Sequence, residues 1–162
     1  MNRREFTLLV SSVSLGFCSA ARASDETTIH IDGDISTPGG VELGDAELIN
    51  LTQTAFYTAT PWTDAPQHFS GPLLSTLLQR VGAGPGNVKV TSFNNYVVEI
   101  ERSLITETAP LLAARINERP FGIRNKGPYW IVFPYDDSVN YQSETIYAAS
   151  VWQVKSITVL KA

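Results

Sequence analysis

Cysteine is almost absent from this chain of 162 residues. Its single cysteine, Cys18, lies in an N-terminal stretch with the features of an export signal, so the mature chain is expected to contain none. A chain without cysteine has no disulfide, no thiolate nucleophile and no thiolate ligand for a metal. The composition therefore excludes cysteine-based catalysis and thiolate metal ligation from the mature protein.

Histidine is nearly as scarce, and the two histidines, His30 and His68, lie far apart in the sequence. A histidine-rich metal site is not expected, although an all-oxygen Ca²⁺ or Mg²⁺ site stays open. A Ser-His-Asp triad would have to use one of these two histidines, and neither lies in a catalytic motif. A carboxylate pair could be drawn from Glu99, Asp136 and Asp137, but acids at strand ends are usually solvated. The chain also lacks the G-x-S-x-G, P-loop, G-x-G-x-x-G and H-E-x-x-H motifs.

Positive charge is low as well. The whole chain has 12 Lys and Arg against 16 Asp and Glu. When residues 1–23 are left out, nine basic and fifteen acidic residues remain, for a net charge of −6. An acidic protein of this kind is not expected to bind nucleic acid or an anionic membrane surface.

The N-terminal stretch MNRREFTLLVSSVSLGFCSAARA, residues 1–23, is predicted to be an export signal. It begins with Arg3 and Arg4, continues through apolar and small residues, and ends in Ala-Arg-Ala, a small-x-small cleavage site. It is too short to be a stable membrane anchor. The paired arginines fit twin-arginine export and also occur in ordinary secretory signals, so the route stays open. We expect a protein of the bacterial periplasm with one domain over residues 24–162.

That domain is predicted to be α+β, mostly β-strand with few short helices. The clearest helix is expected in FSGPLLSTLLQRVGAGPG, where Ser70 would cap the helix, Pro72 would occupy its first turn and Gly82 would end it. One further helical turn is expected with Asp45 as its N-cap. The stretch PLLAARINERP fits either a helix or a strand. Strands are expected in TTIHIDGDI, LTQTAFYTAT, VKVTSFNNYVVEI, PYWIVFP and SVWQVKSITVL.

Aromatic and polar side chains gather where these predicted strands end, which is where binding groups concentrate in proteins. An aromatic plane beside an amide and a carboxylate suits a flat, nitrogen-rich heterocycle. The heterocycle stacks on the ring, and its N–H groups donate to the acid. The candidate ligand-binding residues are Trp62, Asn94, Asn95, Tyr96, Tyr135, Asp136 and Trp152.

Several of these residues have a purely structural alternative. Trp152 could belong to the core, and Asn94-Asn95 could supply positive φ angles for a tight turn. Asp136 could cap a turn. Trp130 lies in the middle of a predicted strand and is expected in the core. Trp62 is the hardest to explain structurally, because it follows a proline in a loop and does not belong to any helical or strand pattern of buried apolar residues.

Several stretches together resemble the oxidoreductase molybdopterin-binding domain, the sulfite-oxidase fold. In that family a G-x-x-L-x-x-L-L helix precedes a strand pair with N-D-Y or similar. A G-P-x-W-[IV]-x-[FY]-P-x-D strand and an S-V-W-Q-[LV] strand follow. The order and approximate spacing hold here from about residue 56 to 160, in FSGPLLSTLL, FNNYVVEI, PLLAARINERP, KGPYWIVFPYD and SVWQVKSITV.

The chain departs from the family's enzymes at two cofactor contacts. The enzymes bind molybdenum through a cysteine thiolate after the strand that corresponds to YTATPW, where this chain has Thr60, Pro61 and Trp62. Their arginine near the G-P-x strand, which suits the cofactor's phosphate, is replaced around Tyr129 and Trp130. The resemblance therefore implies a pterin-sized cleft that has lost its metal thiolate and one phosphate contact, so molybdenum is not expected.

This pattern looks like the small periplasmic pterin-binding proteins that share the fold. The resemblance implies a non-enzymatic protein that binds a reduced, metal-free pterin of the tetrahydropterin type. It also implies a partner, the periplasmic domain of a membrane-bound enzyme that makes or degrades cyclic di-GMP, and a role in surface attachment. Two alternatives stay open: a molybdopterin-dependent oxidoreductase with atypical metal ligation, and an interaction module without a small ligand.

The resemblance also suggests a role for each candidate residue. Trp62, aided by Tyr96 or Trp152, would supply the stacking face. Asp136 would pair with the amino and N–H edge of the pterin, and Tyr135 would stand at the rim of the site. Asn94 and Asn95 would hydrogen-bond to a ring oxygen or nitrogen.

Overall fold

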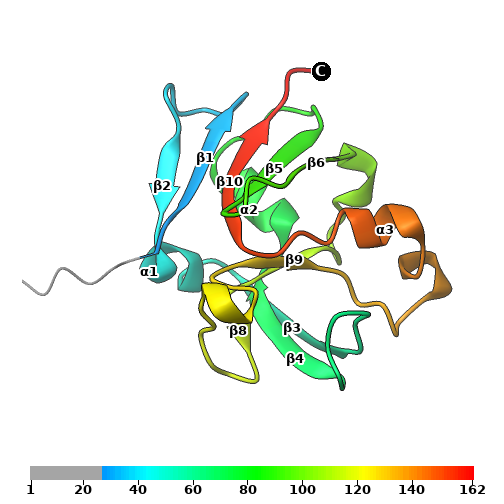
Figure 1. Ribbon diagram of the computed structural model, residues 1–162. Coiled ribbons are helices and arrows are strands. Elements are labelled where there is room, and N and C mark those ends of the chain that lie inside the picture. The colour runs from blue at the N-terminus through cyan, green and yellow to red at the C-terminus, as the bar shows by residue number, and fades with distance from the viewer. Residues whose placement is uncertain (1–26) are drawn as a thin grey trace, which may run out of the picture.

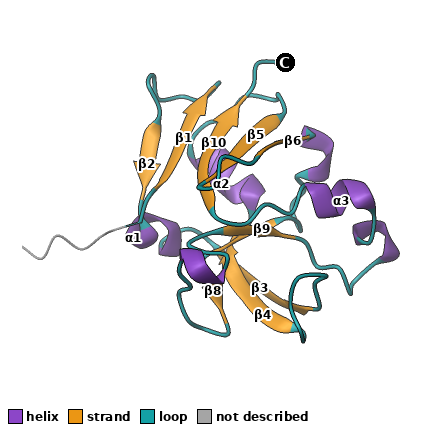
Figure 2. Ribbon diagram, viewed as in Figure 1, coloured by secondary structure: helices purple, strands orange, loops and turns teal. Residues whose placement is uncertain are grey.

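The computed structural model describes residues 27–162, so the predicted export signal and Cys18 lie outside the described residues. The described chain forms three small sheets with short helices around them (Figures 1 and 2). The strands are β1 (Ile29–Gly33), β2 (Val41–Leu43), β3 (Gln53–Thr58), β4 (Gln67–Pro72), β5 (Val88–Ser92), β6 (Val97–Ile100), β7 (Leu111–Ala113), β8 (Arg115–Ile116), β9 (Trp130–Val132) and β10 (Val154–Val159). The helices are α1 (Asp45–Ile49), α2 (Leu74–Arg80) and α3 (Glu144–Ala148), with short 3₁₀ turns at Arg102–Leu104, Ile123–Asn125 and Val139–Tyr141.

The largest sheet has five strands in the order β2-β1-β10-β5-β6. Its β1 and β10 strands run parallel, while the other neighbours are antiparallel. A second sheet has the order β3-β4-β8, and β7 pairs with β9. Figure 1 shows β9 between the large sheet and the β3-β4-β8 sheet. The isolated bridge from Trp130 to Trp152 connects β9 to the segment that enters β10.

The core follows the two-residue period of the strands. In β1, Ile29 and Ile31 are fully buried, while the residues between and after them are partly or fully exposed. Helix α2 adds Leu74, Leu77 and Leu78, all with no exposed area. Burying one such side chain contributes about 1.5–3 kcal/mol, so these apolar faces hold the sheets together.

Helix α2 begins later than the sequence predicted. Ser70 and Pro72 belong to β4, where each is paired with a residue of β3, and the N-cap is Leu73. Pairing with β3 keeps this segment extended, and it overrides the local preference of Ser-Gly-Pro for a helix start. The predicted end of the helix is confirmed, because Gly82 has a φ of +62° and closes the last turn.

The N-cap of α1 was also predicted wrongly. The cap is Gly44, whose N–H donates to Oε2 of Glu47 at 2.9 Å. Asp45 is instead held by Arg115, with Nη1–Oδ1 and Nη2–Oδ2 distances of 2.7 and 2.6 Å. This hydrogen bond from Arg115 holds the pKa of the Asp45 carboxyl below its usual value. The bidentate pair ties α1 to β8.

The remaining elements mostly follow the prediction. VKVTSFNNYVVEI forms the β5–β6 hairpin, in which Asn95 has a φ of +64°. PLLAARINERP forms β7 and β8, and Asn117 and Glu118 make the turn after them with positive φ angles. Helix α3 was not predicted. It is capped by Ser143, whose hydroxyl accepts the N–H of Ile146 at 3.4 Å.

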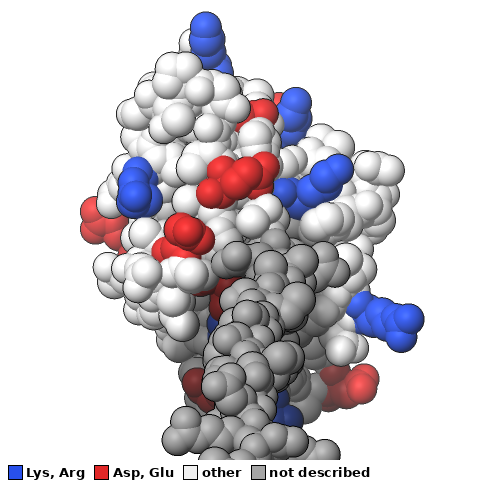
Figure 3. Space-filling model, turned by 90° about the vertical axis from the view of Figure 1, so that its left-hand side faces the viewer, with Lys and Arg blue, Asp and Glu red and all other residues white. Residues whose placement is uncertain are grey.

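Charged side chains on the face that carries β2 and α1 are of both signs (Figure 3). Several acidic side chains lie together near the middle of this face, and the Lys and Arg side chains are scattered around them. The described residues visible on this face form no continuous basic surface of the kind that nucleic acid requires. Within residues 27–162, none of the helices has the length and apolar character needed to cross a membrane.

Candidate ligand-binding site

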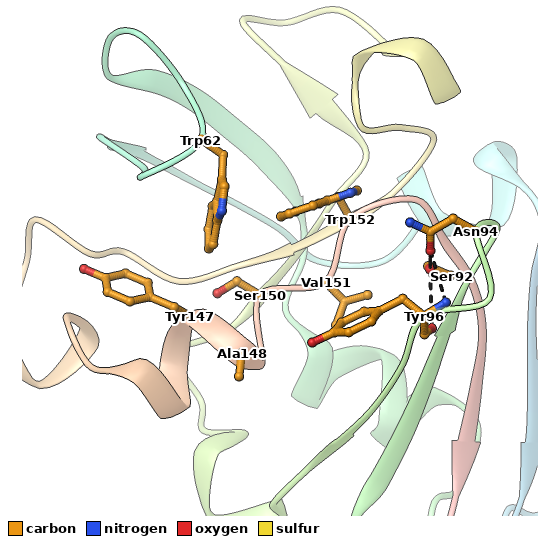
Figure 4. A pocket seen from close by; sticks show the side chains of 9 residues that line it. All are labelled: Trp62, Ser92, Asn94, Tyr96, Tyr147, Ala148, Ser150, Val151 and Trp152. Carbon is orange, nitrogen blue, oxygen red and sulfur yellow. Dashed lines mark hydrogen bonds between the residues drawn. The ribbon is translucent and has the colours of Figure 1, made fainter.

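A cavity of about 300 Å³ opens where three parts of the chain meet: the loop after β3, the β5–β6 turn and the segment from α3 to the start of β10 (Figure 4). Its volume is at the lower end of the range that small-molecule sites occupy. Four of the seven predicted ligand-binding residues line it, although they come from distant parts of the sequence. They are Trp62, Asn94, Tyr96 and Trp152.

Larger hollows elsewhere on the molecule are less suited to a ligand. Two of them, with volumes of about 450 and 390 Å³, are bordered by Asp45 and Arg115, whose charges already satisfy each other. The cavity beside Trp62 is smaller, but its aromatic rings and uncharged polar groups converge on one volume. We therefore take it as the candidate site.

Aromatic rings form the walls of the cavity. The Trp62 ring centroid lies 5.4 Å from that of Trp152 and 6.0 Å from that of Tyr147, with interplanar angles of 65° and 89°. Behind them, Trp130 and Tyr135 lie 6.1 and 6.3 Å from Trp62. Edge-to-face contacts of this kind are favourable. They hold Trp62 in one orientation, so its ring can serve as a preformed stacking face.

The loop that carries Trp62 is fixed by backbone contacts. The Thr60 hydroxyl, which is almost fully buried, accepts the N–H of Trp62 at 3.1 Å. The carboxylate of Asp136 accepts the N–H of Ala59 at 2.6 Å, and the Asp136 N–H donates to the Thr58 hydroxyl at 3.2 Å. These bonds anchor the end of β3 to the end of β9, and they place Trp62 at the cavity.

Three predicted residues do not line the cavity. Asp136 uses its carboxylate to hold the loop before Trp62, as just described, and so acts as a structural cap. Asn95 adopts the left-handed conformation that the β5–β6 turn requires, which is the structural alternative foreseen for it. Tyr135 is 2% exposed and therefore stands behind the wall, not at its rim. Its hydroxyl lies 2.6 Å from Oγ of Ser150.

The sequence analysis missed several lining residues, among them Ser92, Tyr147 and Ser150. A signal for Ser92 was present: Val88, Val90 and Ser92 alternate in β5 and all three are buried, so a polar group stands at an inward position. No such signal existed for Tyr147, because helix α3 was not predicted.

The lining carries no charged side chain. Its polar groups are the hydroxyls of Ser92, Ser150, Tyr96 and Tyr147, the amide of Asn94 and the indole N–H groups of Trp62 and Trp152. Within residues 27–162, no group of three or more His, Cys, Asp or Glu side chains is placed to hold a metal ion. The lining therefore suits an uncharged ligand, which it could hold through stacking and neutral hydrogen bonds.

Tyr135 makes stability depend on pH. Burial raises the pKa of Tyr135 to about 12 from 10.0, and its hydrogen bond to Ser150 opposes part of that rise. Because the folded pKa exceeds the unfolded one, the stabilisation is complete below about pH 10 and is lost as the pH rises to about 12. We expect the free energy of unfolding to fall by about 2–3 kcal/mol over this range.

This fall can be measured by urea unfolding at several pH values, in the parent and in a Tyr135→Phe variant. The variant should lose most of the fall that is due to Tyr135. Tyr57→Phe is the matched control, because it makes the same chemical change at a side chain that is 70% exposed. An equal fall in the parent and in Tyr135→Phe would contradict the prediction.

Comparison with known proteins establishes the class of fold. No protein-family model matches the sequence, and no curated protein sequence matches it. The structure, however, is that of the sulfite-oxidase type of α+β domain, which confirms the predicted fold class. A solved structure that it resembles is the sulfane dehydrogenase SoxCD from Paracoccus pantotrophus, with a TM-score of 0.64 and 14% sequence identity. The match covers 84% of this chain but 38% of that one, so this chain spans well under half of the enzyme's length.

Proposed function

We propose that this protein binds a reduced, metal-free pterin of the tetrahydropterin type in the cavity beside Trp62. The observation that carries this proposal is the convergence of Trp62, Trp152 and Tyr147 on a small volume that also contains uncharged hydrogen-bonding groups. A pterin is a flat bicyclic ring with a polar edge. Its ring would stack on the indole of Trp62, and its edge would meet Asn94 and the two lining serines.

The residues present do not fit the molybdenum cofactor that enzymes of this fold carry. The position expected for a thiolate is occupied by Thr60, Pro61 and Trp62. The Thr60 hydroxyl is already engaged by the Trp62 N–H and by the Thr63 hydroxyl, at 3.1 and 3.0 Å. No charged side chain of the lining could pair with a phosphate. These features favour a free, unphosphorylated pterin over a metal-loaded cofactor.

We further propose that the protein is exported to the bacterial periplasm and signals there. Its partner would be the periplasmic domain of a membrane-bound enzyme that makes or degrades cyclic di-GMP. The signal-like residues 1–23 and the resemblance to small periplasmic pterin-binding proteins support this proposal. Further support comes from Tyr96, which lines the cavity and is 52% exposed, because a partner there could sense whether the site is filled.

One observation favours a second candidate function, a molybdopterin-dependent oxidoreductase with atypical metal ligation. The solved structure that this fold resembles is a dehydrogenase. Metal analysis separates the two functions, because the oxidoreductase requires stoichiometric molybdenum and the binding protein does not.

The test is to purify the protein under anaerobic, reducing conditions and identify what it carries. Native mass spectrometry should find one pterin per chain, and metal analysis should find no stoichiometric molybdenum. Calorimetry should then show that the emptied protein binds 6-methyltetrahydropterin at one site. Stoichiometric molybdenum, or a protein that neither carries nor binds a pterin, would overturn the proposal.

A further inference from the structure

Ser150, which lines the cavity, has its only hydroxyl proton committed to the backbone. Its Oγ lies 2.7 Å from the carbonyl oxygen of Ile146, which can only accept, so Ser150 must be the donor in this bond. The Tyr135 hydroxyl lies 2.6 Å from the same Oγ. Since Ser150 has no second proton, Tyr135 must donate to it. One acceptor position of Oγ then remains, so toward a ligand Ser150 can act only as an acceptor.

The hydrogen-bonded side chains of Tyr135 and Ser150 are both held in place. Tyr135 is 2% exposed and Ser150 is 3% exposed, so solvent cannot easily replace either bond. The Tyr135 ring also packs against Tyr147, with a centroid distance of 5.5 Å. Tyr135 is thus a positioning residue, which acts on a ligand through Ser150.

A second set of hydrogen bonds determines which groups can donate and which can accept at the other end of the cavity. Oδ1 of Asn94 accepts the backbone N–H of Tyr96 at 3.1 Å, which identifies this atom as the amide oxygen. The single proton of the Ser92 hydroxyl is committed to this oxygen and to the Tyr96 carbonyl oxygen at 3.3 Å, and both of these atoms can only accept. Ser92 is therefore a second acceptor. The Asn94 amide nitrogen has no hydrogen-bond partner within residues 27–162, which makes it a donor for the ligand.

The three groups lie at two ends of the cavity. Figure 4 shows Asn94 and Ser92 together on one side of Val151 and Ser150 on the other side, next to Tyr147. The protein therefore presents a donor and an acceptor together at one end and a second acceptor at the other end.

We infer that the cavity selects a ligand that offers a carbonyl and an N–H group together to Asn94 and Ser92, and an amino group to Ser150. This inference rests on the proposed function and deepens it, because the 2-amino-4-oxo edge of a pterin carries these three groups, with the N–H next to the carbonyl. Recognition by two fixed acceptors discriminates strongly, because a ligand of the wrong polarity leaves the buried hydroxyl oxygens of Ser92 and Ser150 unpaired. An amino group is thus required at the 2-position of the ligand.

The test compares two tetrahydro ligands of nearly equal size, 6-methyltetrahydropterin and its lumazine counterpart, in which a 2-oxo group replaces the 2-amino group. This exchange turns a donor into an acceptor. The parent protein should bind the pterin at least about tenfold more tightly than the lumazine. Ser150→Ala should bring the two affinities close together. Ser75→Ala, a serine of α2 outside the cavity lining, should keep the preference of the parent.

The outcomes separate this inference from the proposed function. If the parent binds neither ligand, the proposed function fails. If the parent binds both equally well, or if folded Ser150→Ala keeps the full preference, the inference is overturned while pterin binding stands. Because a ratio of affinities is compared, a variant that is merely loosened would weaken both ligands and leave the ratio unchanged. Should Ser150→Ala fail to fold, Ser150→Cys provides the second variant, and it should reduce the preference because sulfur is a weak hydrogen-bond acceptor.

Discussion

Replacing Trp62 with alanine is expected to weaken the binding of 6-methyltetrahydropterin by roughly 5- to 150-fold, which corresponds to about 1–3 kcal/mol for a buried aromatic anchor. The change removes the stacking face. It also removes the ring against which Trp152 and Tyr147 pack, at centroid distances of 5.4 and 6.0 Å. Both remaining walls of the cavity would therefore lose part of their support. Anaerobic calorimetry on the parent and the variant measures the effect.

Two further variants make this result specific. Trp62→Phe keeps a smaller aromatic face and should lose less affinity than alanine. Tyr57→Ala removes an exposed aromatic ring that stacks on His68 at 4.6 Å, away from the cavity lining, and should bind like the parent. A folded Trp62→Ala protein with the affinity of the parent would show that the ligand does not stack on this ring.

Replacing Trp130 with alanine is expected to lower the free energy of unfolding by about 3–5 kcal/mol, the usual cost of deleting a large buried aromatic side chain. Trp130 has no exposed area. Its ring lies 5.4 Å from Phe69 and 6.1 Å from both Trp62 and Trp152. It therefore joins the β3-β4-β8 sheet to the wall of the cavity. Urea unfolding followed by circular dichroism should show a lower midpoint with little change in slope.

The matched variant for this prediction is Trp130→Phe. The indole nitrogen of Trp130 is buried and has no hydrogen-bond partner within residues 27–162. Phenylalanine thus loses volume but no hydrogen bond, and because it leaves a smaller cavity than alanine we expect a clearly smaller cost. If the two substitutions cost the same, packing of the indole ring is not what stabilises this part of the core.

The elements that the sequence predicted well are those with a strong local pattern. Trp130 in PYWIVFP was expected in the core and is fully buried there. Gly82 was expected to end a helix and does so with a positive φ. The errors lie at helix starts: strand pairing kept Ser70 and Pro72 extended, and Gly44 took the capping role expected of Asp45. Caps depend on neighbours that are distant in the sequence, whereas buried runs depend on composition.

The candidate site was predicted in part for the same reason. Trp62 stood out because no packing period explained it, and Asn94 stood out because it lies in a turn between two strands. Both line the cavity. Asp136 was misplaced because a carboxylate after a strand suits a ligand and a backbone cap equally well. The distance that decides between them is the 2.6 Å from its oxygen to the N–H of Ala59, a residue far away in the sequence.

The sequence by itself determined the class of fold, the buried strands, the absence of cysteine from residues 24–162 and the presence of aromatic residues at strand ends. These follow from composition and local periodicity, which every segment carries on its own. Only the tertiary structure decided which polar atoms face the cavity and whether each one donates or accepts. A hydroxyl can donate or accept, and the partner that takes its proton decides which role is left for a ligand. The proton of Ser150 goes to the Ile146 carbonyl and that of Ser92 to the Asn94 oxygen.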